Sequence, residues 1–346
     1  MKFKDILEQY NYELPGELIA QAPAMPRESA RLLVYTISTG RMAFDIFKNL
    51  GKYLPKNSVL VFNQTKVMPA RLQVQKTTGG KAEILYLGQE TGLIKALSNR
   101  LLLPGTSASI LQRGKTSGRT FKVVRKSGQF YFLKPNFPIK ELPVMLQKFG
   151  LTPLPPYIKN SPLSEKQKRV QYQSVFAKAG ESVAAPTASL HFSKNLITRL
   201  KKQGFKKKFA SLNVGLGTFA PLAEKNYSSG KLHTETYEIK AEILRELKNA
   251  KKHKYPIIAV GTTAARTLET VAKTGRLKGQ TSIFIKPPYR FRLMDGLITN
   301  FHVPKSSLMM LVASLVGREK LLKLYETAMK KRFRFFSFGD GMLILP

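Results

Sequence analysis

The chain has 346 residues, enough to bury a large core and to form two domains. It carries 58 Lys and Arg residues against 21 Asp and Glu, a formal net charge of +37, while its hydrophobic fraction of 43% is ordinary for a globular protein. The absence of Cys excludes disulfides, thiolate metal sites and a cysteine nucleophile, and it agrees with a reducing compartment.

The first part of the chain predicts the beginning of an α/β sheet. Residues 31–37 are typical of a strand, and a Ser-Thr-Gly turn and a short helix-like stretch follow it. Residues 58–62 predict a buried strand, and Asn63-Gln64-Thr65 interrupt the pattern. The N-terminal residues lack the apolar core of a signal peptide.

The next segment differs in character. Between Leu72 and Leu133, short runs alternate apolar and polar residues between Gly-rich turns, which predicts a small antiparallel barrel or sandwich. Residues 139–149 predict a helix, and the three prolines from Pro153 to Pro156 predict a stiff return linker. We therefore expect an α/β main domain with a mixed sheet (residues 1–64 and 153–346, the catalytic part) and an inserted all-β, barrel-like domain (residues 65–152).

The second half alternates predicted helices and buried strands. Periodicity predicts helices over residues 195–204 and 241–252, after residue 263, and from Ser306 or Ser307 to Val316. It predicts strands at 209–214, 256–260 and 282–285. Because ligands gather at the carboxyl ends of strands in such sheets, we expect the chemistry in the turns that follow them.

Small residues dominate the segment 182–192, SVAAPTASLHF, which fits neither a helix nor a strand pattern. Small side chains such as Ala185 and Pro186 let the backbone approach a ligand closely. If the segment is extended, Thr187, Ser189 and His191 face one side and offer hydroxyl and imidazole groups. The alternative for His191 is a core histidine bonded to a backbone carbonyl.

A second motif, VGLGTF at 214–219, places Gly215, Gly217 and Thr218 at a strand end. Its backbone amides would suit an adenine edge, a carboxylate or a phosphate, and a plain tight turn is the alternative. The motif lacks the third glycine of a dinucleotide fingerprint. It also does not match the acidic, glycine-rich loop of Rossmann-type methyltransferases.

The segment GTTAAR at 261–266 joins a buried strand to a helix. Free amides at the helix start and the hydroxyls of Thr262 and Thr263 would bind an anion. Arg266 lies about one turn further and would reach the same ligand or pair with Glu269. A helix cap followed by a surface arginine is the alternative.

The segment DGLITNFH at 295–302 brings Asp295, Asn300 and His302 close to a predicted helix start. These groups suit an acid/base pair, although Asp-Gly and Asn-Phe are also ordinary turn pieces. In the apolar C-terminal run, Asp340 lies between two glycines and needs a partner if it is buried.

The remaining polar candidates do not indicate a metal centre. His233 and Glu235 alternate and would share one strand face, most simply as a surface pair. None of the four histidines has the spacing of a metal ligand set, so we predict no metal.

The charge favours nucleic acid as the partner, because a polyanion releases its condensed counterions on contact with Lys and Arg. An anionic membrane surface is a second candidate, and a generally basic host proteome is the alternative explanation. No apolar run reaches the roughly 20 residues that span a bilayer. We expect a soluble, cytoplasmic protein that does not bind membranes.

The chain resembles the S-adenosylmethionine:tRNA ribosyltransferase-isomerase family of queuosine biosynthesis. The resemblance runs nearly end to end, and many motifs appear in the same order. They are YELPGELIAQAP, PRESARLLV, VLVFNQTKVMPARL, TGGKAEILYL, TPLPPYI, QYQSVFAKAGESVAAPTASLHF, NVGLGTFAPL, HTETYEI, IIAVGTTAARTLET, DGLITNFHVPKSSLMMLV and FRFFSFGDGMLI.

The resemblance implies a fold and a reaction. The family combines an α/β domain with a small inserted β-barrel-like domain. It transfers and isomerises the ribosyl part of S-adenosylmethionine onto 7-aminomethyl-7-deazaguanine at the tRNA wobble position, giving epoxyqueuosine with release of adenine and methionine. S-adenosylmethionine is thus a consumed substrate, and no cofactor is expected. The expected partner is a tRNA with a GUN-type anticodon, and we expect a monomer or a weak homodimer.

Some positions depart from the family pattern. Ser282, Lys286 and Pro288 replace an acid, an aromatic residue and a glycine, which puts the substrate contacts of that loop in doubt. Ser189 replaces a usual Gly and Gly341 a usual Ala, and we expect both small-for-small changes to be tolerated.

A mechanism can be attached to these residues as a hypothesis. The sulfonium acidifies the adjacent ribose carbon, and His191 or His302 would remove its proton. Asp340 or a histidine would protonate the leaving adenine. The amides of 215–218 and 261–263 would hold the nucleoside and the methionine carboxylate. All of this requires the small-residue turns to converge in one cleft at one rim of the sheet.

Two other functions stay open. One is an S-adenosylmethionine enzyme of altered specificity, motivated by the changes at 282–288. The other is a catalytically silent RNA-binding protein that keeps the fold, although such a protein would have little need for the small-residue loops.

Overall fold

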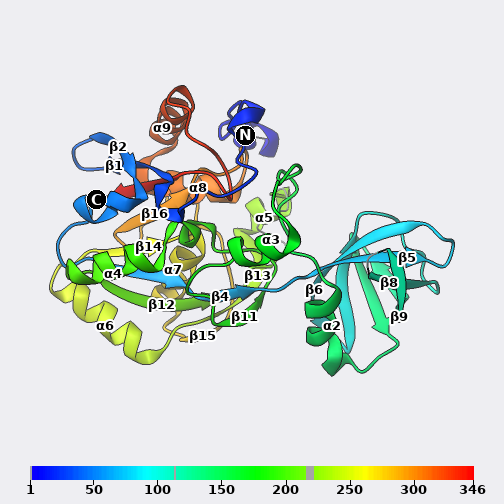
Figure 1. Ribbon diagram of the computed structural model, residues 1–346. Coiled ribbons are helices and arrows are strands. Elements are labelled where there is room, and N and C mark those ends of the chain that lie inside the picture. The colour runs from blue at the N-terminus through cyan, green and yellow to red at the C-terminus, as the bar shows by residue number, and fades with distance from the viewer. Residues whose placement is uncertain (1, 113, 216–221) are drawn as a thin grey trace.

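The central sheet is mixed and nine-stranded in the computed structural model, which describes residues 2–112, 114–215 and 222–346 (Figure 1). The strands follow one another across the sheet in this order: β15 (Lys278–Ile283), β13 (Lys231–Glu238), β12 (Lys206–Leu212), β3 (Val59–Asn63), β14 (Ile257–Val260), β16 (Gly296–Asn300), β17 (Gly341–Leu345), β1 (Arg31–Thr36) and β2 (Met42–Ile46).

The inner strands run parallel and the outer ones do not. β3 pairs in parallel with β12 and β14, and β14 with β16. β17 is antiparallel to β16 but parallel to β1, while β2, β13 and β15 pair antiparallel. β3 and β14 are buried throughout and apolar except for Asn63 at the end of β3, as is typical of strands covered on both faces. The predicted α/β fold with a mixed sheet is confirmed.

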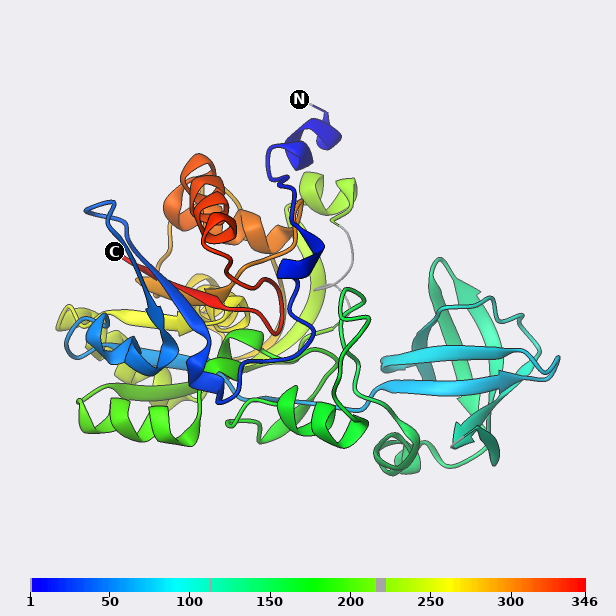
Figure 2. The same cartoon turned by 45° about the horizontal axis from the view of Figure 1, so that its top comes forward.

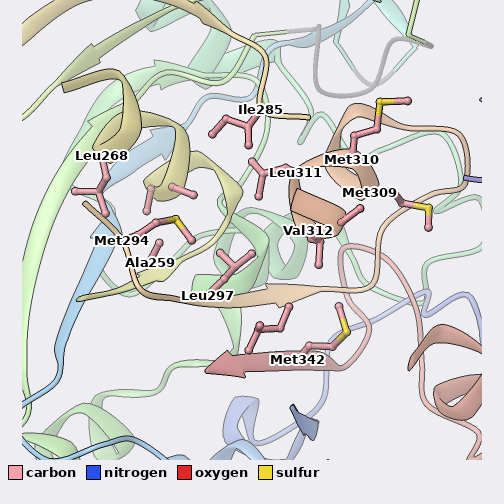
Figure 3. Packing of buried hydrophobic residues seen from close by; sticks show 14 of the residues in the cluster. Ala259, Leu268, Ile285, Met294, Leu297, Met309, Met310, Leu311, Val312 and Met342 are labelled. Carbon is pink, nitrogen blue, oxygen red and sulfur yellow. The ribbon is translucent and has the colours of Figure 1, made fainter. Parts of the chain in front are cut away.

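Helices cover both faces of the sheet. One face carries α6 (Ala241–Lys252), α7 (Thr262–Thr274), α8 (Ser307–Val316) and α9 (Arg318–Lys330), and the other carries α4 (Lys194–Lys202) with the 3-10 helices η3 (Phe47–Lys52) and η5 (Thr187–His191). Figure 3 shows Leu297 and Met342 of the sheet under Leu268 and Leu311 of the helices. Burying each such side chain contributes about 1.5–3 kcal/mol.

The inserted segment forms a separate antiparallel sheet of six strands whose hydrogen-bonded order closes on itself. Its interior is a hydrophobic cluster of its own, against which α2 (Leu142–Phe149) packs. The strands, in their order around the ring, are β10 (Phe130–Pro135), β7 (Leu93–Ser98), β6 (Lys81–Glu90), β5 (Arg71–Lys76), β8 (Ser107–Gln112) and β9 (Lys115–Ser127).

Two chain segments connect this barrel to the main body, and Figure 2 shows it standing to one side of the sheet. The outgoing segment contains β4 (Thr65–Val67), which pairs in parallel with β11 (Ala179–Ser182) of the main body. The returning segment leads through the proline linker to α3 (Glu165–Gln171). The remaining short helices are α1 (Phe3–Glu8), α5 (Glu224–Ser229), η1 (Gly16–Leu18), η2 (Arg27–Ser29) and η4 (Ile139–Glu141).

Local patterns misplace two elements. The helix-like stretch before residue 58 contains the edge strand β2 as well as η3. The strand predicted at 282–285 ends at Ile283, because Phe284 and Ile285 leave the sheet and enter the core beyond it. Across the described ranges, no helix is both long and apolar enough to cross a membrane.

Candidate active site

A pocket of about 810 Å³, partly open to solvent, lies where β12, β14 and β16 end. Parallel strands bring their carboxyl ends to one rim of a sheet, so turns distant in sequence meet there. The lining residues come from seven stretches of the chain: Pro156, Tyr157, Ala185, Pro186, Thr187, Ala188, Val214, Gly261, Thr262, Thr263, Thr299, Asn300, Phe301, His302, Val303, Leu308, Phe336 and Ser337.

Half of the candidate residues from the sequence share this pocket. They are Ala185, Pro186, Thr187, Thr262, Thr263, Asn300 and His302. Five others lie around it without lining it, namely Ser189, His191, Gly215, Arg266 and Asp340. Gly217 and Thr218 lie outside the described residues.

The small-residue segment is not extended at its end. Residues 187–191 form η5, which has about three residues per turn, so residues two apart do not face the same side. Thr187 lines the pocket, whereas Ser189 and His191 point into the protein and are buried. The Ser189 hydroxyl finds no hydrogen-bond partner among the described residues.

His302 lies in the pocket just beyond β16. Its Nε2 is 2.8 Å from the hydroxyl of Thr299, and its backbone N–H donates to the hydroxyl of Tyr325 at 2.9 Å. The Tyr12 hydroxyl donates to its carbonyl. Burial lowers the pKa of His302 to about 3. The ring is therefore neutral near pH 7, and His302 is held by one hydrogen bond to its ring and two to its backbone.

His191 lies behind the pocket wall, beside a smaller cavity of about 200 Å³ that also borders Ser337. Its ring stacks on Phe47 at a centroid distance of 4.1 Å. Burial, and secondly the charge of Arg334, lower the pKa of His191 to about 3. The Nε2 atom is buried and has no partner in the described part of the chain.

Asn300 lines the pocket, and its side chain also lies next to His191, where it partly offsets the lowering of the His191 pKa. The Nδ2 of Asn300 donates to the carbonyl of Phe336 at 3.0 Å, which fixes the amide so that Oδ1 points elsewhere. Oδ1 is buried and has no partner within residues 2–112, 114–215 and 222–346. Phe336 adopts a left-handed φ of 69°, a strained conformation for a large side chain that is typical of functional sites.

Sequence reasoning missed three lining residues with hydroxyl groups. The Tyr157 and Ser337 hydroxyls lie 2.7 Å apart, and burial raises the pKa of Tyr157 to about 12. Thr299 contacts His302. Tyr157 directly follows the proline linker, where the chain returns to the main domain. This position was the feature of the sequence that could have identified Tyr157 as a site residue.

Asp340 is buried and hydrogen-bonded to the backbone around it. Its carboxylate accepts the backbone N–H groups of Arg31 and Arg334 at 2.9 and 2.8 Å, and Nη2 of Arg334 lies at 3.4 Å. The residue is 1% exposed and does not border the pocket. A buried carboxylate requires hydrogen-bond partners, and for Asp340 these are the backbone N–H groups of Arg31 and Arg334.

Arg266 pairs with Glu235 instead of Glu269. Glu269 accepts the backbone N–H groups of residues 292–294 and the hydroxyl of Tyr289. Glu235 is buried while His233 is exposed, because β13 changes register between residues 231 and 235, so the predicted shared face is wrong.

The side chains near the pocket offer no evident metal centre. In the part of the chain that the structure describes, no group of three or more His, Asp or Glu side chains is arranged to hold a metal ion.

Comparison with known proteins gives one consistent result. Residues 7–344 match the family model described as queuosine biosynthesis protein. The S-adenosylmethionine:tRNA ribosyltransferase-isomerase of Carboxydothermus hydrogenoformans is 44% identical over the full length of both chains. That of Thermotoga maritima is 41% identical over 98% of this chain and 99% of its own. A crystal structure of S-adenosylmethionine tRNA ribosyltransferase from Thermotoga maritima matches with a TM-score of 0.56 and 32% identity, covering 97% of this chain and 100% of its own.

Proposed function

The chain belongs to the queuosine biosynthesis protein family, and we propose that it catalyses the family reaction in full. The ribosyl part of S-adenosylmethionine is transferred and isomerised onto 7-aminomethyl-7-deazaguanine at the wobble position of a tRNA with a GUN-type anticodon. Epoxyqueuosine forms, and adenine and methionine are released. Since the second substrate is tRNA, we place the activity in the cytoplasm.

The observation that carries this proposal is the single pocket at the strand ends. Its volume suits a ligand of the size of S-adenosylmethionine. Two of its buried polar atoms, Thr263 Oγ1 and Asn300 Oδ1, have no protein partner in the described ranges. Buried polar groups are rarely left unpaired, so these atoms support a polar ligand.

We assign the small side chains to the nucleoside. Ala185, Pro186 and Thr187 leave room for the adenine and ribose rings at the pocket wall. Asn300 Oδ1 accepts a hydrogen bond from the substrate, and Ser189 supports the wall from behind. Gly215, which follows the lining residue Val214, is proposed to contribute to the nucleoside side; Gly217 and Thr218, the other two residues proposed for this role, lie outside the described residues.

His302 is proposed as the general base. Its neutral imidazole removes the proton from the ribose carbon next to the sulfonium, and it then delivers that proton to adenine as the C–N bond breaks. The proton is returned in the same turnover, so the buried imidazolium exists only briefly. The aminomethyl nitrogen of the tRNA base is then proposed to bond to the remaining sugar chain with loss of a proton, and an oxygen of that chain displaces methionine from the sulfonium carbon to close the epoxide.

His191 and Asp340 are proposed to hold other residues of the site in place. His191 supports Asn300 and the pocket wall from behind, where its ring packs on Phe47. Asp340 holds the turn that carries Phe336 and Ser337. Adenine protonation is therefore assigned to His302, because the carboxylate of Asp340 already accepts two backbone N–H groups.

Single-turnover release of adenine tests the histidine roles. We expect His302→Ala to slow it by about 100-fold or more, the usual contribution of general acid–base catalysis, and His191→Ala to slow it less. His253→Ala is the control, since that side chain is exposed on the last turn of α6. Wild-type rates in both variants would exclude a histidine base.

The overall reaction has its own test. The protein is incubated with S-adenosylmethionine and a tRNA that carries the precursor base, and the tRNA is digested and examined by mass spectrometry. The epoxide-bearing nucleoside is expected. Adenine release without this product would instead indicate an enzyme of altered specificity.

A further inference from the structure

Arg266 is a buried cation with unused donors. It is 6% exposed, and Nη1 of its guanidinium contacts the carboxylate of Glu235. Its Nε and Nη2 atoms are buried and have no hydrogen-bond partner in the described ranges. A guanidinium offers five N–H donors and no acceptor, so the unused ones require a ligand that accepts.

The position of Arg266 on α7 places it next to the pocket, although its own side chain does not line the pocket. Side chains of a helix lean toward its N-terminus, and residues three and four apart share a face. Arg266 therefore lies over Thr262 and Thr263, which both line the pocket. Oγ1 of Thr263 is likewise buried and without a partner in the described chain.

The start of α7 adds further donors. The helix has 13 residues, and its N-cap, Gly261, supplies no side-chain cap. The first backbone N–H groups of a helix have no acceptor within the helix and carry its positive dipole end. The first turns of one helix thus carry guanidinium, hydroxyl and amide donors, a combination that favours an anion.

Glu235 holds the guanidinium in place. One of its carboxylate oxygens binds Arg266, and the other accepts the N–H of Gly215 at 3.3 Å, next to the lining residue Val214. Glu235 is 5% exposed. It fixes one edge of the guanidinium between β13 and the end of β12, which leaves Nε and Nη2 for the ligand.

We propose that Arg266, Thr263 and the start of α7 bind the carboxylate of the methionine part of S-adenosylmethionine, with Glu235 as a positioning residue. This proposal rests on the proposed function, and it adds the group that orients the substrate in the pocket. A carboxylate accepts two parallel N–H bonds from a guanidinium edge. An RNA phosphate has the same acceptor chemistry, but the depth of Arg266 favours the free end of a small molecule.

A binding cycle tests the proposal. The affinities of S-adenosylmethionine and of its decarboxylated analogue, which keeps the sulfonium, are measured by calorimetry for the wild type and for Arg266→Gln. Each titration is run with protein alone and with an unmodified tRNA transcript present. In the wild type, we expect loss of the carboxylate to weaken binding by roughly 10- to 100-fold, the range of charge-assisted hydrogen bonds. In Arg266→Gln the two ligands should bind almost equally.

Further variants separate binding from folding. Thr263→Val keeps the shape of the side chain and should reduce the preference for the carboxylate even if Arg266→Gln fails to fold. Glu235→Gln should reduce the same preference while the analogue binds as before, whereas a merely structural role would weaken both ligands alike. Arg169→Gln, which removes a guanidinium paired with Glu165 outside the pocket, is the matched control and should change neither affinity.

The outcomes distinguish this proposal from the proposed function. Equal binding of the two ligands by the wild type, or a preference that survives Arg266→Gln and Thr263→Val, overturns the carboxylate site and leaves the enzyme assignment intact. Weaker tRNA binding in Arg266→Gln with an unchanged ligand preference assigns the donors to a phosphate and also overturns it. Binding of neither ligand by the wild type, with or without tRNA, overturns both.

Discussion

His191 and His302 are the two buried histidines among the described residues, and they differ in what surrounds them. His302 borders the pocket and has a hydroxyl beside Nε2, whereas His191 packs on an aromatic ring and leaves Nε2 unpaired. Burial opposes protonation of both rings, because a charged imidazolium would lose its hydration. Only the ring that reaches the pocket can exchange protons with a substrate there.

These shifts predict a loss of stability in acid. The folded-state pKa of each ring is about 3, against 6.5 for an ordinary histidine. Between these values the unfolded chain binds more protons, so the free energy of unfolding falls as the pH drops, by up to about 1.4 kcal/mol per pH unit for each histidine. Urea unfolding between pH 7 and 5 should show a smaller slope for His302→Gln than for the wild type. Equal slopes would contradict neutral burial of this ring.

Gly341 makes room for the ring that supports His191. A Cβ at this position would lie 2.9 Å from Cζ of Phe47 and 3.0 Å from the carbonyl oxygen of Thr299. Gly341→Ala, which restores the usual family residue, should therefore displace the Phe47 ring and cost about 1–3 kcal/mol, as overpacking does. Urea unfolding measures this cost, with Gly16→Ala as the control because its Cβ would meet open space. A loss no larger than in the control would show that Phe47 adapts freely.

At the scale of elements, the site is built from strand ends and helix starts. β14 leads directly into α7, and β16 ends at Asn300, two residues before His302. Ser306 caps α8 by accepting the N–H of Met309 at 3.4 Å, which ends the turn after His302. Regular elements therefore fix the turns that carry the polar groups.

The two segments that connect the barrel to the sheet cross at Gly150. A Cβ on Gly150 would lie 1.8 Å from the carbonyl oxygen of Pro69 and 2.5 Å from that of Leu146, and backbone atoms cannot move aside cheaply. Gly150→Ala should force the segments apart, lowering stability by about 3 kcal/mol or more. It should also speed proteolysis near residues 66–70 and 150–156. Cleavage at the wild-type rate with an unchanged unfolding midpoint would contradict this.

At the scale of the whole molecule, a sheet body that contains the pocket is combined with a separate barrel, and both parts of the chain contain more Lys and Arg than Asp and Glu. A formal charge of +37 produces a field that attracts polyanions over distances beyond contact. This property suits a large RNA substrate that has to be held while one base enters a small pocket.

The affinity for tRNA should therefore depend steeply on salt. Neutralised phosphates release counterions, so raising NaCl from about 0.05 to 0.2 M should weaken binding by roughly 10- to 1,000-fold or more. S-adenosylmethionine is the internal control, because its affinity should change little over this range. Filter binding or fluorescence anisotropy measures the affinity for tRNA at each salt concentration. A flat salt dependence would assign the charge excess to something other than RNA contacts.

The sequence by itself determined the family and many of the strands and helices, although it misplaced β2 and β15. β14 and the first four residues of β3 are continuous apolar runs, and α6 and α8 have the predicted ends, because periodicity and capping are local properties. Strand order, by contrast, depends on pairing between residues far apart, and only the folded chain showed which turns meet at one rim.

Side-chain roles were decided by tertiary structure alone. Arg266 pairs with Glu235 from another strand and not with Glu269 on its own helix, and Asp340 is satisfied by the turn around it. His191 and His302 look alike in the sequence, yet one is walled off from the pocket and the other borders it. The physical reason is that burial, pairing and pKa depend on neighbours in space, and a linear pattern contains no record of these.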